Sequence, residues 1–167
     1  MSKTSLPRRP RMIGPRQTIA IIASIYNDEF VSALIKAAQK ELEQLVPQAT
    51  VPLLRVPGAY EIPVCAQYLA KHGNPDVIIA LGVVIRGETA HADLVASSVC
   101  DSLQRVATEN LVPIVNEVLL LNNAEQAKER CMGTRINRGV EAARAAAGMA
   151  EMFQKLQRTY APEKSNG

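Results

Sequence analysis

The chain has 167 residues, which fits a single domain, and hydrophobic side chains make up 47% of it. That share is enough for a substantial core, but aromatic residues contribute only 4% and tryptophan is absent, so the core must be aliphatic. The three cysteines, Cys65, Cys100 and Cys131, are odd in number and far apart. This spacing argues against a secreted disulfide framework and a cysteine-based metal site, and it favours reduced thiols in the cytoplasm.

The net charge of +3 comes from one end of the chain. Residues 1–17 carry five of the 19 basic side chains and no acidic one, which leaves 14 basic against 16 acidic side chains in the rest. The body of the protein is therefore no polyanion binder, and we expect no nucleic-acid partner. The apolar run at 19–23 is too short for an export signal or a membrane span. We predict a basic, proline-containing tail at 1–17, one domain at 18–160 and a frayed end at 161–167.

Apolar runs predict four strands, at 18–24, 51–56, 77–85 and 114–121. The first and third are continuously apolar, which is typical of strands covered on both faces of a sheet. Pro52 lacks an N–H donor and so predicts an edge position for the second strand.

Between these strands the sequence predicts helices. Apolar residues recur at spacings of three and four from Phe30 to Leu45, and helical patterns also cover 62–71, 93–109, 124–131 and 137–160. Strands that alternate with helices require right-handed crossovers and a parallel sheet. The expected fold class is α/β: a flavodoxin-like, three-layer α/β/α sandwich around a four-stranded parallel sheet.

Ligands of such open sheets bind beyond the carboxyl ends of the strands, and here those ends carry polar, aromatic and glycine residues. After the third strand, Gly87 would permit a tight turn and Thr89 could cap a helix that begins near His91. The free N–H groups of that helix start suit a phosphate, although the spacing alone favours an ordinary capped turn. His91 could transfer protons near neutral pH, or it could be a solvated surface histidine.

Other residues also allow two interpretations. Tyr26, after the first strand, could stack on a ligand ring or belong to the core. Asn116 and Glu117 interrupt an apolar strand, so we expect them to line a site or a subunit interface. Arg130 could clamp a phosphate or be solvated.

Four motifs together resemble the lumazine synthase family, over roughly residues 18–156. They are ASIYN at 23–27, RVPGAYEIP at 55–63, LGVVIRGETAHADLV at 81–95 and EQAKER with INRG between 125 and 139. The resemblance implies condensation of 5-amino-6-(D-ribitylamino)uracil with 3,4-dihydroxy-2-butanone 4-phosphate, which gives 6,7-dimethyl-8-ribityllumazine, phosphate and water. It implies no cofactor and no metal.

The resemblance also implies roles for individual residues. His91 would be the catalytic proton donor and acceptor. The ribitylaminouracil would contact Tyr26, Ala59, Tyr60, Glu61, Val83, Val84, Ile85 and Asn116. The phosphate substrate would be held by Glu88, Thr89 and Arg130, the last reaching in from a neighbouring subunit.

Some positions depart from the family pattern. Asn116 stands where many members have Phe, Ala92 replaces an aromatic after the catalytic histidine, and Arg138 replaces a usual Lys. The departures at Asn116 and Ala92 motivate one alternative, a non-catalytic paralogue that binds a flavin or lumazine or builds a shell. An archaeal-type riboflavin synthase is a weaker alternative, because the IRGETAH turn matches lumazine synthases better.

The resemblance predicts a homo-oligomer with active sites between subunits, and it suggests riboflavin synthase as a partner. A proline- and arginine-containing tail opposes strand addition to a neighbouring sheet. We therefore predict a pentamer rather than a sixty-subunit cage.

Overall fold

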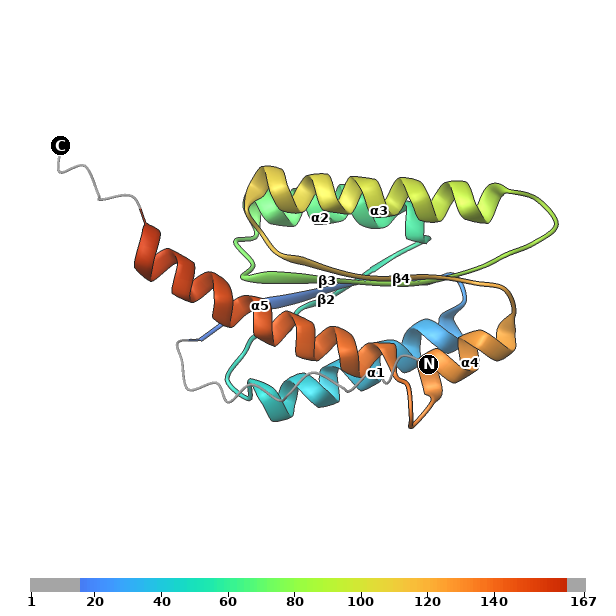
Figure 1. Ribbon diagram of the computed structural model, residues 1–167, viewed down its shortest axis with the longest axis horizontal. Coiled ribbons are helices and arrows are strands. Elements are labelled where there is room, and N and C mark those ends of the chain that lie inside the picture. The colour runs from blue at the N-terminus through green and yellow to red at the C-terminus, as the bar shows by residue number, and fades with distance from the viewer. Residues whose placement is uncertain (1–15, 162–167) are drawn as a thin grey trace.

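The computed structural model describes residues 16–161 and consists of one parallel sheet between two helical layers (Figure 1). The strands are β1 (Ile19–Ser24), β2 (Leu53–Val56), β3 (Val77–Ile85) and β4 (Ile114–Leu121), in the order β2-β1-β3-β4. The helices are α1 (Asp28–Leu45), α2 (Ile62–His72), α3 (His91–Asn110), α4 (Ala124–Met132) and α5 (Arg138–Tyr160), with a 3-10 turn η1 (Ala59–Glu61) before α2. The predicted fold class is confirmed.

The strand positions follow from the apolar patterns. β1 and β3 are central and almost wholly buried, as their continuous apolar sequences predict. β2 lies at one edge, as Pro52 predicts, and it begins two residues later than expected, at Leu53. β4 forms the other edge and pairs only with β3 among the described residues.

The helix bounds differ from the predictions mainly at their beginnings. α1 begins at Asp28 rather than Phe30. α3 begins at His91, as expected from the turn after β3 and two residues before the apolar pattern at 93–109. Both first turns contain acidic side chains, which the positive end of a helix favours, so helix forms before the apolar stripe starts. The predicted tail falls mostly outside the described residues, but Gln17 is 3% exposed and its carbonyl accepts the Thr50 N–H.

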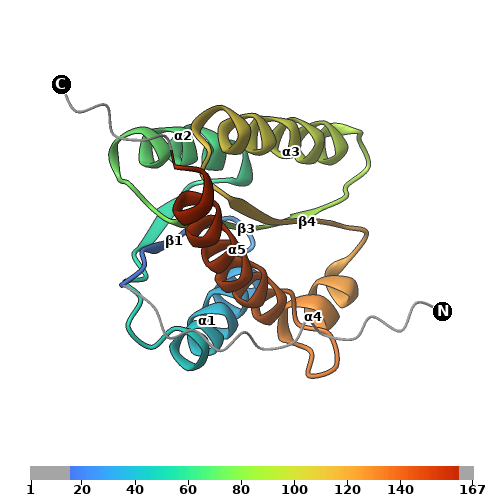
Figure 2. The same cartoon turned by 60° about the vertical axis from the view of Figure 1, so that its left-hand side comes forward.

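The sheet has a separate apolar core on each face, because successive side chains of a strand point to opposite sides. One core joins β1 and β3 to α1, α4 and α5, and it includes Ile21, Leu34 and Leu81. The other joins the same strands to α2 and α3, and it includes Ile22 and Leu103. Figures 1 and 2 show the two helical layers on either side of the sheet. No helix in residues 16–161 has the length and apolar character that crossing a membrane requires.

Helices α1 and α5 approach each other closely because α5 buries a stripe of small residues. Ala142, Ala143, Ala146, Ala147 and Ala150 are all at most 1% exposed. At Gly139 a Cβ atom would lie 2.4 Å from the Leu34 carbonyl oxygen of α1, so only glycine fits there. A buried ion pair between Arg144 Nε and Glu41 Oε1, 2.8 Å apart, also links the two helices.

Gly139 and Gly148 on α5 allow a matched test of this packing. We expect Gly139→Ala to lower the free energy of unfolding by roughly 1–3 kcal/mol, because the added carbon must push α5 away from α1. Gly148→Ala should instead raise it by about 1 kcal/mol, since no atom lies within 4 Å of its Cβ position and alanine is the better helix former. Urea unfolding followed by circular dichroism measures both. Equal effects of the two substitutions would show that the close approach at Gly139 is unimportant.

Candidate active site

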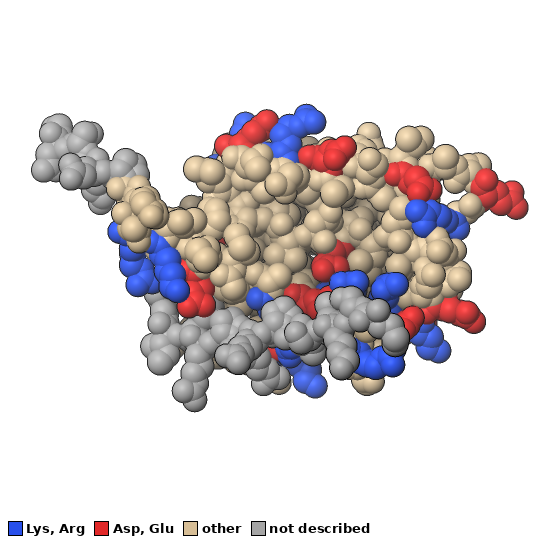
Figure 3. Space-filling view, in the orientation of Figure 1, with Lys and Arg blue, Asp and Glu red and all other residues tan. Residues whose placement is uncertain are grey.

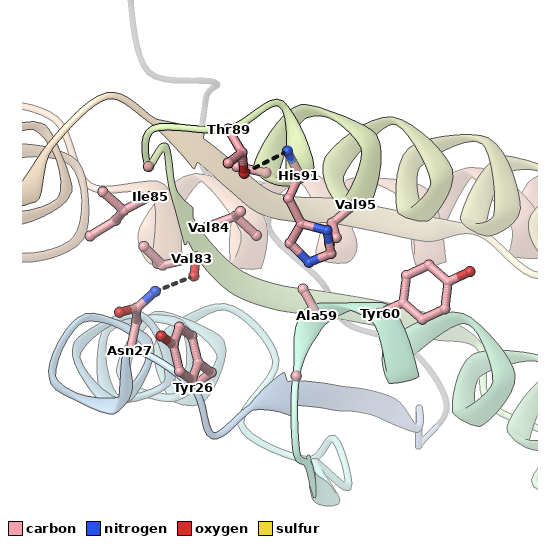
Figure 4. A pocket seen from close by; sticks show the side chains of 13 residues that line it. Tyr26, Asn27, Ala59, Tyr60, Val83, Val84, Ile85, Thr89, His91 and Val95 are labelled. Carbon is pink, nitrogen blue, oxygen red and sulfur yellow. Dashed lines mark hydrogen bonds between the residues drawn. The ribbon is translucent and has the colours of Figure 1, made fainter.

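A cavity of about 380 Å³ lies beyond the carboxyl ends of β1 and β3, at the beginning of α3. It is mostly apolar and is lined by Tyr26, Asn27, Gly58, Ala59, Tyr60, Val83, Val84, Ile85, Gly87, Thr89, His91, Ala92 and Val95. We call it the histidine cavity. In Figure 4 the His91 imidazole and the Tyr26 ring lie on opposite sides, with Val83 and Val84 of β3 between them.

Tyr26 is presented to this cavity by the turn between β1 and α1. Its side chain is 74% exposed, which excludes the interpretation as a core aromatic. The Tyr26 N–H donates to the Pro57 carbonyl at 3.0 Å. Asn27 takes a left-handed backbone conformation (φ 58°), and its Nδ2 donates to the Val83 carbonyl at 2.7 Å. Asparagine is among the few residues that adopt this conformation readily, so the turn joins the ends of β1 and β3 at low cost.

The loop after β2 contributes Ala59 and Tyr60 to the histidine cavity, but not the Glu61 carboxylate. Glu61 Oε2 instead accepts the Gly58 N–H at 2.8 Å and so caps η1. A Cβ atom at Gly58 would lie 2.9 Å from this oxygen, which explains why glycine suits the position. The cap fixes the loop that bears Ala59 and Tyr60.

Arg86 anchors the turn between β3 and α3. Its guanidinium forms hydrogen bonds to Asp93 at 2.8–3.3 Å, and its Nη1 donates to Asn122 Oδ1 at 2.6 Å. Its backbone N–H donates to the Leu121 carbonyl. The Arg86 side chain, at the beginning of the turn, thus connects the start of α3 to the end of β4. The interaction with Asp93 raises the Arg86 pKa and lowers the Asp93 pKa, which keeps both groups charged.

The turn itself differs from the predicted arrangement. Gly87 does not have a positive φ, and a Cβ atom there would meet nothing within 4 Å, so the backbone does not require glycine. Thr89 Oγ1 lies 3.5 Å from the His91 N–H, at the outer limit of a hydrogen bond, and α3 therefore starts with free N–H groups. Thr89 and His91 line the histidine cavity, whereas Glu88 is exposed and does not.

Asn116 and Arg130 lie away from the histidine cavity of their own chain. Asn116 is exposed on the edge strand β4, and its Oδ1 accepts the Val118 N–H at 3.0 Å. Arg130 is on α4 and lines a second, polar cavity of about 370 Å³. That cavity is lined by Arg86, Leu119, Leu120, Leu121, Asn122, Gln126, Arg130 and Arg138, and we call it the arginine cavity.

Three arginines around one cavity suit an anion, although they are not equally available. Arg86 is engaged by Asp93 and Asn122, and Arg138 Nη1 donates to Glu141 Oε2 at 2.6 Å. The Arg130 guanidinium forms no hydrogen bond or ion pair with other residues in the described part of the chain. It is therefore the cation with the most capacity to bind an anion from outside its own chain.

Glu117 has the most perturbed carboxyl group near these cavities. It lies on β4, half-buried, and burial raises its pKa from 4.5 to about 7. Arg138 opposes this shift and Glu141 adds to it. Glu117 in turn contributes to a raised pKa of Cys131, about 11, for which burial is the main cause. The sequence marked Glu117 as unusual in an apolar strand, but the proximity of α5 could not be read from it.

Glu117 should make the folded protein less stable as the pH rises. Between pH 4.5 and 7 the folded state holds a proton that the unfolded state has lost, so stability falls with increasing pH. Glu117→Gln removes this loss, and we expect it to raise the stability at pH 8 by roughly 1–3 kcal/mol and to have little effect at pH 4.5.

The thermal midpoint at a series of pH values measures this effect. Glu43→Gln, on the exposed face of α1, is the control and should leave the pH profile unchanged. If the difference between Glu117→Gln and the natural protein were the same at every pH, the carboxyl group would not titrate as described.

Comparison with known proteins agrees with this architecture. A family model described as 6,7-dimethyl-8-ribityllumazine synthase matches residues 16–154. The 6,7-dimethyl-8-ribityllumazine synthase of Mycolicibacterium gilvum is 40% identical over 159 residues, which cover 93% of this chain and 98% of that protein. The enzyme of the same name from Pediococcus pentosaceus is 38% identical over 146 residues, 87% of this chain and 94% of that protein. The chain therefore belongs to the 6,7-dimethyl-8-ribityllumazine synthase family of enzymes.

Proposed function

We propose that this chain condenses 5-amino-6-(D-ribitylamino)uracil with 3,4-dihydroxy-2-butanone 4-phosphate. The products are 6,7-dimethyl-8-ribityllumazine, phosphate and water, in the penultimate step of riboflavin biosynthesis. The observation that carries this proposal is the composition of the histidine cavity. Eight of the twelve site residues expected from the sequence line it: Tyr26, Ala59, Tyr60, Val83, Val84, Ile85, Thr89 and His91.

The cavity suits a planar heterocycle bound next to a proton-transfer group. The exposed Tyr26 ring offers a stacking surface, and the valines of β3 offer an apolar floor. The backbone N–H groups of Ala59 and Tyr60 are available for the polar edge of the ring. The polar residues of the cavity are few, so they determine how the ligand is oriented.

The proposed reaction consists of Schiff-base formation, loss of phosphate and ring closure. Each step moves a proton to or from nitrogen, carbon or oxygen, and none needs a strong nucleophile, a metal or a redox cofactor. His91 is the group in the cavity that can do this near neutral pH. The remaining contribution is the placement of two substrates side by side, which can account for a large part of the rate.

The phosphate would be held by the turn before α3 and by arginine from a second copy. The free N–H groups at the start of α3 and the Thr89 hydroxyl are suited to an anion. Within one chain, Arg130 and Asn116 do not reach the histidine cavity. Both are on or beside β4, an edge strand that would otherwise leave backbone groups unpaired. Figure 3 shows a largely uncharged surface over β4 between α3 and α5.

We therefore propose that the open side of β4 packs against another copy and completes that copy's site, in a ring. Such a heterologous contact generates a closed ring when the rotation between copies closes. Five copies, the number expected from the resemblance, remain the proposal for the assembly.

Incubating the purified protein with both substrates and following lumazine absorbance tests the activity directly. His91→Ala should lower kcat by roughly tenfold to a thousandfold, since positioning would continue without proton transfer. Arg130→Ala should mainly raise KM for the butanone phosphate. Ligand binding without turnover by the natural protein would contradict the proposal and support a non-catalytic binding protein.

Hybrid assemblies test whether the site lies between copies. Co-expression of His91→Ala and Arg130→Ala chains should restore about a quarter of the sites, because random neighbours combine an intact His91 with an intact Arg130 that often. With the butanone phosphate well below its KM, the specific activity should then exceed that of either variant alone. Activity no higher than the mean of the two variants would show that both residues act within the same chain.

A further inference from the structure

Arg138 is the arginine of the arginine cavity that is paired only in part. Its Nη1 is bonded to Glu141 Oε2, but its Nε is buried and has no hydrogen-bond partner. A buried, unsatisfied N–H of a charged group is costly, so the guanidinium gains from any further acceptor that comes within reach. Two acceptors compete for it: an anion in the cavity, and a carboxylate from the protein.

Glu117 is that carboxylate. Its neighbours Val115 and Leu119 pack against the core formed with α1, α4 and α5, so the Glu117 side chain lies on the same face of β4. The charged or titratable groups that face it are Arg138 and Glu141 from α5 and Cys131 from α4. The Glu117 carboxyl group forms no hydrogen bond or ion pair among residues 16–161.

The arrangement therefore places one carboxylate in contact with the guanidinium and a second within electrostatic range of it. Glu141 is bonded to Arg138 directly, whereas Glu117 acts on it through space from the sheet. An ionised Glu117 attracts the guanidinium towards the sheet and also repels an anion in the cavity. A neutral Glu117 does neither. Both effects therefore weaken anion binding when Glu117 is ionised.

We propose that Glu117 is a positioning residue for Arg138 and makes anion binding in the arginine cavity dependent on pH. Protonation of Glu117 releases the Arg138 guanidinium to the anion, and ionisation withdraws it. The reverse also holds: a bound anion favours protonated Glu117. This inference rests on the proposed function only in taking the natural anion to be the phosphate of the substrate.

The burial of Glu117 places the ionisation of its carboxyl group near neutral pH. Because its pKa is raised to about 7, the carboxyl group is mostly neutral at pH 6 and mostly ionised above pH 8. Binding of an anion should therefore weaken across that interval, over and above any contribution from His91.

Sulfate is a suitable probe, because it stays doubly charged between pH 6 and 8.5 whereas a phosphate group titrates there. We expect the Kd for sulfate, measured by calorimetry on the assembled full-length protein, to increase about threefold to tenfold from pH 6 to 8.5. In Glu117→Gln most of this increase should disappear, and the Kd at pH 8.5 should approach the natural value at pH 6. Glu43→Gln should behave like the natural protein.

Two further measurements separate positioning from other effects. Arg138→Gln should weaken sulfate binding and abolish its dependence on Glu117; if the dependence persisted, Glu117 would not act through Arg138 and the inference would be wrong. In turnover assays Glu117→Gln should lower KM for the butanone phosphate above pH 8 with little change in kcat. An unchanged sulfate profile in Glu117→Gln would overturn the inference even if lumazine is formed. The expected profile in a protein without lumazine activity would overturn the proposed function alone.

Discussion

The parallel order of four strands is the constraint on which the other features depend. In a parallel sheet every strand points the same way, so the segments that follow the strands all meet at one edge. Here those segments are the turn after β1, the loop after β2 and the turn after β3, and together they enclose the histidine cavity. The same order exposes β4 at the opposite side from β2, next to the arginine cavity. The group proposed for proton transfer therefore lies beyond the carboxyl ends of the strands, in the histidine cavity. The arginines proposed to bind the anion lie beside the open side of β4, in the arginine cavity.

Local patterns predicted the fold well because they reflect burial directly. Continuous apolar runs correspond to central strands, and the single Pro52 was enough to assign an edge. Apart from the start of β2, the bounds that differ most lie at helix starts, where backbone N–H groups and acidic side chains decide rather than the apolar stripe. Periodicity carries no information about such ends.

The site was predictable only in part, because its details depend on contacts between distant segments. The position of Tyr26 depends on Asn27, which bonds to a carbonyl 56 residues further along the chain. The family resemblance implies a substrate contact for Glu61, which stays a prediction; the sequence did not reveal that the Glu61 carboxylate caps a backbone N–H three residues away. The environment of Glu117 comes from α5, more than twenty residues later. Residue types at strand ends indicate where a site lies; they do not indicate how its members share hydrogen bonds.

The close contact at Gly139 also affects the neighbouring Arg138. This arginine begins α5 one residue before the glycine, and Asn137, one residue earlier, accepts the N–H groups of Gly139 and Val140. The main chain of Arg138 is therefore held in place, whereas its guanidinium can still bind either a carboxylate or an anion. A binding group on an immobile main chain loses little conformational entropy when it binds a ligand. Little of its interaction free energy is then offset by ordering of the main chain, and the affinity is higher. The closely packed helices would thus contribute to ligand capture without touching the ligand.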